Sequence, residues 1–112
     1  MDNPKFQIYT GKGGQFYFRL IAKNGQNVLS SEGYSSKAAC KNGVESVKKN
    51  APQDERYQCK EAKGGKFHFV LTAPNGKVIG SSQMYASAET CKKGIAAVKR
   101  AAADAGVEDT AG

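Results

Sequence analysis

Apolar residues follow two different spacings along the chain, and each spacing predicts an element. They recur at every second position in Phe6–Thr10 and again in Phe16–Ala22, as in strands that bury one face. This interval changes to three and four residues beyond Ser36, on a stripe made of Cys40, Gly43, Val44 and Val47. The longer interval is typical of an amphipathic helix, and Ser35 and Ser36 offer hydroxyls to cap its first turn.

The same succession occurs twice. Residues 6–50 align with residues 57–101 without a gap, and 19 of the 45 aligned positions are identical. A unit of that size buries too little surface to be stable alone, so we expect the two repeats to share one core. With a third strand near Asn27–Ser31, the sequence predicts an α+β fold: tandem β-β-β-α repeats that share one antiparallel sheet, with two helices packed on one face and pseudo-twofold symmetry.

The repeats also define the organisation of the chain. We expect a single domain over residues 1–112, because neither repeat has a sufficient core of its own. Within this domain we distinguish repeat one (6–50), a connector (51–56), repeat two (57–101) and an acidic tail (102–112). In the tail, we expect Val107–Asp109 to add a short edge strand.

Glycines recur at equivalent places in both repeats. Gly11–Gly14 and Ala62–Gly65 supply the positive φ angles of tight reversals between strands. Asn24-Gly25, like its counterpart in repeat two, is the dipeptide favoured in two-residue type I′ hairpins. Gly43 and Gly94 lie on the inward stripes of the predicted helices, where each costs about 1 kcal/mol relative to Ala. We therefore expect the helix backbone to approach the sheet closely at these two positions.

Positive charge is concentrated in the two repeats. The formal charge of the chain is +7; repeat one carries seven basic and two acidic residues, and repeat two carries eight and two. The tail is acidic, with Asp104, Glu108 and Asp109. Such a field favours association with polyanions, although lysines on the outer side of an amphipathic helix are also its ordinary solvated face.

Three cysteines, Cys40, Cys59 and Cys91, are an odd number and form no CxxC pair. Cys40 and Cys91 are equivalent in the repeat, so we interpret them as two copies of one packing site rather than as a bridge. Free cysteines behave as small buried hydrophobes and indicate a reducing compartment. The chain opens without an apolar signal segment and contains no run of membrane-spanning length, so we expect a cytoplasmic protein with no membrane partner.

The segment from Gly33 to Pro52, GYSSKAACKNGVESVKKNAP, carries the most specific pattern of the chain. With the strand, KGG turn, alternating aromatics and NG hairpin before it, this segment resembles the YegP-like proteins, a bacterial domain family of unknown function, in their tandem two-repeat form. The resemblance implies one sheet with strand exchange between the halves, and it implies no catalytic residue. Repeat two departs from the pattern at Met84–Ser87 and at Lys93, which replaces Asn42, so a site that depends on Asn42–Glu45 would exist in one half.

No group of residues in the sequence has the pattern of a catalytic or metal site. His68 is the only histidine, it has no ligand cluster at metal-binding spacing, and its counterpart in repeat one is Tyr17. The glycine turns match neither phosphate-binding signature and join strands instead of opening helices. The paired serines lack a base and an orienting group, and helix capping explains them. We therefore expect no enzyme, no metal and no cofactor.

The sheet face away from the helices is the most informative surface. Strand alternation places on it a possible ligand or partner face made of Tyr9, Tyr17, Arg19, Lys60 and His68, accompanied by Gln7, Ile21, Gln58, Val70 and Thr72. Exposed Tyr and Ile favour a protein interface, whereas aromatics among basic groups on an open sheet also stack single-stranded bases in some domains.

Two hypotheses follow from this face. The first is a non-enzymatic interaction module that binds protein partners or associates with itself. The alternative is low-specificity binding of single-stranded nucleic acid through the basic, aromatic face of the sheet. Because the repeat pair already lies within one chain, we expect a monomer.

Overall fold

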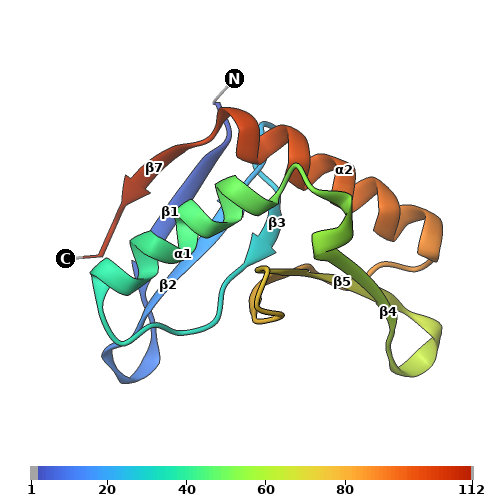
Figure 1. Cartoon of the computed structure of the whole chain (residues 1–112), viewed down its shortest axis with the longest axis horizontal. Coiled ribbons are helices and arrows are strands. Elements are labelled where there is room, and N and C mark those ends of the chain that lie inside the picture. The colour runs from blue at the N-terminus through green and yellow to red at the C-terminus, as the bar shows by residue number, and fades with distance from the viewer. Residues whose placement is uncertain (1–2, 112) are drawn as a thin grey trace.

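Two helices lie across one face of a seven-stranded sheet in the computed structural model, which describes residues 3–111 (Figure 1). Repeat one forms β1 (Lys5–Thr10), β2 (Phe16–Ile21), β3 (Asn27–Ser30) and α1 (Lys37–Asn50). Repeat two and the tail form β4 (Tyr57–Glu61), β5 (Phe67–Thr72), β6 (Val78–Ser81), α2 (Ala88–Asp104) and β7 (Gly106–Asp109). The predicted α+β class and shared sheet are confirmed. Within residues 3–111, no helix is long and apolar enough to cross a bilayer.

The strands of the two repeats extend outward from a central junction, in the order β4-β5-β6-β3-β2-β1-β7. At the junction, β3 and β6 meet through the single antiparallel pair of Ser30 and Ser81, which are equivalent residues of the two repeats. The pseudo-twofold axis therefore passes between them. The predicted edge strand in the tail is confirmed as β7, which adds one parallel pair, with β1, to a sheet whose other pairs are antiparallel.

The strand exchange implied by the family resemblance is limited to β7. The three strands of each repeat stay together in the sheet, whereas β7 follows repeat two along the chain and pairs with β1 of repeat one. The reason lies in the end of α2. The amide of Gly106 donates to the carbonyl of Pro4 at 3.3 Å, so the tail leaves the helix beside the start of β1 and runs along it. One edge of the sheet is thus covered by β7, and β4 forms the other.

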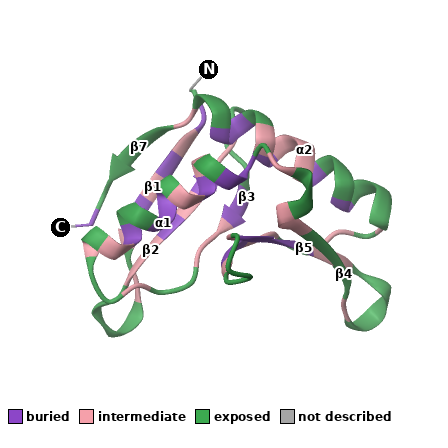
Figure 2. Cartoon of the chain, in the orientation of Figure 1, coloured by how far each residue is buried: buried purple, intermediate pink, exposed green. Residues whose placement is uncertain are grey.

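The core lies between the helices and the sheet, and along β1 buried positions alternate with partly exposed ones (Figure 2). At the central junction the repeat symmetry is broken. Leu29 of β3 is 1% exposed, and a Cβ atom on its counterpart Gly80 would lie 2.7 Å from the Leu29 Cγ atom. Two leucines beside the axis would collide in a close-packed interior, so one large side chain fills the space that the missing one leaves.

The two Asn-Gly turns differ from the expected type. Type I′ requires positive φ at both central residues, and among residues 3–111 only glycines have positive φ, so this prediction is wrong. Instead, the amide of Gly25 donates to the carbonyl of Ala22, and the amide of Ala22 donates to the carbonyl of Gln26, both at 2.8 Å. This is a type I turn closed by a bulge at Gly25, whose φ is 84°. Asn24 stabilises the turn with its side chain, which accepts from the Gln26 amide at 3.0 Å.

Both helices begin at the serines that the sequence indicates. Ser36 Oγ accepts a hydrogen bond from the Ala39 amide at 3.1 Å, and Ser87 Oγ accepts from the Thr90 amide at 3.2 Å. The first helix ends at Asn50, as the proline of the connector indicates, although Ala51, the residue before that proline, keeps helical angles of φ −55° and ψ −35°. The capping predictions are therefore confirmed in both repeats.

The inward glycines of the helices leave room for a tyrosine ring between the helix and the sheet. This finding corrects the expectation that the helix and sheet backbones approach each other closely. A Cβ atom on Gly43 would collide with the Tyr34 ring, and one on Gly94 would collide with the Tyr85 ring. Each tyrosine ring stacks in turn on a core phenylalanine, with centroids 6.2 Å apart in both repeats. The glycines are thus needed because a ring is inserted between the helix and the sheet.

Candidate functional site

Three of the five predicted site residues lie together on the face of the sheet away from the helices. Tyr9 of β1 and Tyr17 of β2 are paired across the strands, and their rings stack with centroids 5.6 Å apart. The guanidinium carbon of Arg19 lies 4.1 Å from the centroid of the Tyr9 ring. We call these three residues the Tyr9 cluster. The aromatic and cation–π contacts within it are each worth about 0.5 to 1 kcal/mol.

Tyr17 occupies a recess that two glycines make possible. A Cβ atom on Gly11 would collide with the Tyr17 ring, and one on Gly33 would lie 3.1 Å from its hydroxyl oxygen. The hydroxyl donates to Gln15 Oε1 at 3.3 Å. In repeat two the tyrosine and the two glycines are all replaced, by His68, Ala62 and Met84. The recess is therefore a feature of repeat one.

Lys60 and His68 form a separate pair. They lie opposite each other on β4 and β5, and β6 and β3 separate them from the strands of the Tyr9 cluster. Lys60 is exposed, whereas the Nδ1 atom of His68 is buried and has no hydrogen-bond partner within residues 3–111. The five predicted residues thus divide into a cluster of three and a pair of two, on opposite halves of the sheet.

Two other residues expected on this face are buried. Val70 is 7% exposed and Thr72 is 6% exposed. The hydroxyl of Thr72 donates to the carbonyl of Arg56 at 3.0 Å, so the connector, in the short 3₁₀ turn Asp54–Arg56, lies against this end of β5. Strand alternation predicts the direction of a side chain but not what a connector covers, so the open face is smaller in repeat two than predicted.

The two edges of the sheet differ in what covers them. On the outer side of β1, the Thr110 amide donates to the Ile8 carbonyl at 2.8 Å. The tail thus covers this edge, and Ile8 is fully buried. β4 is the equivalent strand of repeat two, and no other strand of the described chain pairs with its outer side. Its residues Gln58–Glu61 are accordingly exposed.

The tail strand is bound to repeat one by opposite charges. Lys5 Nζ lies 3.3 Å from Glu108 Oε2, and Lys37 Nζ lies 3.1 Å from Asp109 Oδ2. Hydrogen bonds from Gln7 and then from Lys5 lower the pKa of Glu108, and the hydrogen bond from Lys37 lowers the pKa of Asp109. An acidic strand is therefore paired with a basic edge.

The uncovered edge carries comparable groups. Arg56 and Gln58 occupy the repeat positions of Lys5 and Gln7, the two residues that hold Glu108. No ion pair within residues 3–111 engages Arg56, and its buried Nε atom has no hydrogen-bond partner there. The β4 edge thus has polar and basic side chains at the positions that bind the tail on β1.

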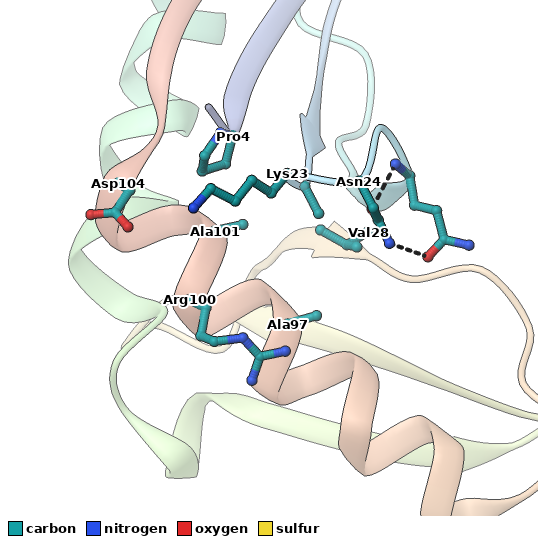
Figure 3. Close-up of a pocket in the computed structure, with 10 residues that line it drawn as sticks. Pro4, Lys23, Asn24, Val28, Ala97, Arg100, Ala101 and Asp104 are labelled. Atoms are coloured by element: carbon teal, nitrogen blue, oxygen red, sulfur yellow. Dashed lines mark hydrogen bonds between the residues drawn. The ribbon is translucent and has the colours of Figure 1, made fainter. Parts of the chain in front are cut away.

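A hollow of about 320 Å³ lies between α2, the start of β1 and the turn from β2 to β3 (Figure 3). Apolar atoms of Val28, Ala97 and Ala101 line it, and Lys23, Arg100 and Asp104 also border it. It contains none of the five predicted site residues and none of the buried polar atoms that lack a partner in the described chain. Its lining therefore points to no particular ligand.

Cysteine positions agree with the prediction in two cases out of three. Cys40 and Cys91 are fully buried, as two copies of one packing site should be, whereas Cys59 is exposed on β4. Among residues 3–111, no three side chains gather that could hold a metal ion.

The uncovered β4 edge is the feature that the sequence did not lead us to expect. The signal was present in the repeat alignment, where Ile8 and Tyr9 of β1 become Cys59 and Lys60 of β4.

One protein family matches the chain twice, over residues 12–58 and 62–109, and its description is "Domain of unknown function (DUF1508)". A UPF0339 protein from the ptx operon 5′ region of Stutzerimonas stutzeri is 56% identical over 102 residues, which are 91% of this chain and 92% of that protein. The UPF0339 protein YegP of Escherichia coli K12 is 49% identical over 94 residues, or 84% of this chain and 86% of YegP.

Two solved structures share the fold. The solution NMR structure of YegP from E. coli, a protein of unknown function, has a TM-score of 0.92 at 44% identity and covers 100% of this chain and 97% of its own. The solution NMR structure of a UPF0339 protein from Shewanella oneidensis has a TM-score of 0.90 at 35% identity and covers 98% and 93%. These comparisons establish the fold and name no ligand or reaction.

Proposed function

The chain belongs to the DUF1508 family of YegP-like (UPF0339) proteins, whose function is unknown, and we propose that it is a binding module that pairs an extended acidic segment of a partner protein with β4. One observation carries the proposal. The equivalent strand, β1, already binds an extended acidic segment, which is the protein's own β7. We assign no catalytic step to the site.

The backbone of β4 provides the first half of the recognition. A strand at the edge of a sheet presents a row of unpaired amide and carbonyl groups, onto which an extended peptide can add as a further strand. On β1 this row is used by the tail, whereas on β4 no described residue uses it. A bound strand would also cover Cys59 and Tyr57, whose counterparts Ile8 and Phe6 are both fully buried.

Side chains of repeat two provide the second half. Arg56 and Gln58 can hold a carboxylate as Lys5 and Gln7 hold Glu108. Lys92 occupies the repeat position of Lys41, whose charge helps to lower the pKa of Asp109. A segment with an acidic residue at the position of Glu108, followed by a second one, therefore fits this edge. Ala88 replaces Lys37, so the second acidic residue would be held less firmly.

A peptide titration tests the proposal. We would add the octapeptide Ala-Gly-Val-Glu-Asp-Thr-Ala-Gly, the sequence of residues 105–112, to the isotope-labelled full chain and record amide chemical shifts. Binding should shift the amides of Gln58–Glu61. A control peptide with Gln and Asn in place of Glu and Asp should bind more weakly. Arg56→Met should weaken binding about fivefold, the equivalent of one exposed ion pair of about 1 kcal/mol, and Lys5→Met should leave binding at β4 unchanged.

Three outcomes would overturn this proposal. Shifts confined to β1 would mean that the peptide merely displaces the protein's own tail. The absence of any shift at millimolar peptide would mean that the β4 edge accepts no acidic strand. An increase in molecular mass with concentration, measured by sedimentation without peptide, would mean that a second copy of the chain is the occupant.

A second candidate function is binding of single-stranded nucleic acid by the Tyr9 cluster. The observation that favours it is the stacked pair of Tyr9 and Tyr17 beside Arg19, on a chain of net charge +7. Its test is a titration with labelled single-stranded DNA and RNA at low and physiological salt. Binding that weakens with salt and in a Tyr17→Ala/Arg19→Ala variant would support this function, and no binding at low salt would exclude it.

We propose further that the module is a monomer in the bacterial cytoplasm. The argument for a monomer is that the two repeats already complete one shared core. The argument for the cytoplasm is the presence of three free cysteines, which are typical of a reducing compartment. Sedimentation of the purified chain and fractionation of the native bacterium test these two points.

A further inference from the structure

Two cysteine side chains of repeat two are in contact. Cys59 of β4 lies opposite Phe69 in the strand pairing and therefore on the side of the sheet that faces the helices, and Cys91 lies in the first turns of α2. Their Sγ atoms are 2.8 Å apart. This distance is about 0.8 Å longer than a disulfide bond, whose length is roughly 2.05 Å.

Repeat one contains no equivalent pair. The counterpart of Cys91 is Cys40, which is also fully buried, but the counterpart of Cys59 is Ile8. Packing alone does not require a second thiol here, because isoleucine fills the same position in repeat one. The comparison of the repeats thus isolates one substitution, which brings a second thiol beside a buried cysteine.

The two thiols differ in their access to solvent. Cys59 is exposed because no strand of the described chain covers β4, whereas Cys91 is 0% exposed. Burial, followed by the hydrogen bond and the charge of Cys59, raises the pKa of Cys91 to about 12. A reagent in solution therefore meets Cys59 first, and Cys91 is placed to react with whatever Cys59 has become.

We propose that Cys59 and Cys91 are a redox-active dithiol, which a low-molecular-weight disulfide such as oxidised glutathione converts to an intrachain disulfide. The Cys59 thiolate attacks one sulfur of the small disulfide, forms a mixed disulfide and releases one thiolate. Cys91 then loses its proton, and its sulfur attacks Cys59 Sγ and releases the second thiolate. The two protons lost by the cysteines protonate the two released thiolates, so two protein thiols are oxidised by two electrons and one small disulfide is reduced to two thiols.

The dithiol links two elements of repeat two. Oxidation joins the uncovered edge strand β4 to the start of α2, whereas the equivalent elements of repeat one, β1 and α1, have no such connection because Ile8 carries no sulfur. The inference does not rest on the binding function proposed above, because the reaction is measured in the free chain without a partner. Failure of one proposal therefore leaves the other intact.

The test is to treat the full chain with oxidised glutathione and to measure its intact mass and its cross-linked peptides. The expected product has lost two hydrogens, carries no glutathione, links the peptides of Cys59 and Cys91 and leaves Cys40 free. Cys40→Ser should give the same product. In Cys91→Ser, the glutathione adduct on Cys59 should persist, because no second thiol displaces it.

A further variant covers the case in which a serine disturbs the fold. Cys59→Ile copies the natural residue of repeat one, so it should fold, and it should give neither disulfide nor adduct at this site. A persistent adduct in the natural chain, a product that includes Cys40, or no reaction of Cys59 would overturn the proposal.

The rate of ring closure provides a second readout. Because Cys91 must lose its proton and burial raises the pKa of its thiol, closure of the isolated adduct should accelerate as the pH rises from about 7 to about 9. A rate that does not depend on pH would contradict the assigned role of Cys91.

Discussion

Repeat one and repeat two have the same three strands and helix, and they differ most at the edges of the shared sheet. In repeat one, β7 covers β1, and Ile8 and Phe6 beneath it are fully buried. In repeat two, β4 has no covering strand among the described residues, and the corresponding positions are Cys59 and Tyr57. The apolar edge residues of repeat one are thus replaced where the edge faces solvent.

This difference shows which parts of the module are free to diverge. The KGG turns, the phenylalanines of β2 and β5, the helix glycines Gly43 and Gly94, and the helix cysteines Cys40 and Cys91 are identical in both repeats, because each of them is needed to close one copy of the core. The edge strands and the helix-free face are not needed for that purpose. Repeat one therefore has the Tyr9 cluster and the edge that the tail covers, and repeat two has the dithiol and the uncovered edge.

The largest expected effect concerns the one core position at which the repeats differ beside the axis. Leu29→Gly should lower the free energy of unfolding by about 4 kcal/mol, because it removes a buried leucine. Gly80→Leu should cost about 2 to 3 kcal/mol by overpacking against Leu29. Urea denaturation of the double variant should show stability within about 2 kcal/mol of the natural chain, since the leucine is then supplied from the other strand. Additive losses would contradict this shared packing space.

The next effect is a gain in stability when the dithiol is oxidised. A bond between Cys59 and Cys91, 32 positions apart, should raise the free energy of unfolding by about 3 kcal/mol, because it restricts the unfolded chain. Denaturation with and without a reducing agent measures this gain. Cys59→Ile should show no difference between the two conditions, and a gain in that variant would mean that another cause is acting.

Removal of the tail would make the two edges alike. A chain that ends at Ala105 should lose about 2 kcal/mol of stability, because Phe6 and Ile8 lose part of their apolar cover. It should also gain a second edge that accepts the acidic octapeptide, visible as amide shifts in both β1 and β4. Glu108→Gln/Asp109→Asn, the matched control, keeps the strand and should cost less than the truncation. Binding at β4 that disappears on truncation would contradict the independence of the two edges.

The smallest effect is a dependence of the tail on pH. The pKa values of Glu108 and Asp109 are lowered in the folded chain, so their contribution to stability is present above their ordinary values of 4.5 and 3.8 and is lost as the pH falls through the lowered values. Carboxyl NMR titration should find both groups below those ordinary values. Lys5→Met and Lys37→Met should return them upward, each acting on its own partner, and unchanged titrations in these variants would contradict the ion pairs.

Much of the architecture follows from local sequence. The two periods of apolar spacing, the capping serines and the glycine turns give the elements, and the duplication gives the shared sheet. These predictions succeed because a strand, a cap or a tight turn depends on residues that are neighbours in the chain. The predicted type of the Asn-Gly turns was wrong, although a turn type is also a local property. The preceding residues, such as Pro74 in repeat two, favour a type I turn, and only the backbone angles show that Gly76 closes it alone.

The candidate site is decided by distant parts of the chain. The sequence places Tyr9, Tyr17 and Arg19 on one face of the sheet. It does not show that β6 and β3 separate these residues from Lys60 and His68.

The contact between Cys59 and Cys91 and the cover that the tail gives to β1 arise in the same way, from groups 32 and about 100 positions apart. Alternation determines on which side of a sheet a residue lies. Which edge is covered, and which thiols touch, depends on where α2 delivers the last strand, and that is a property of the assembled core.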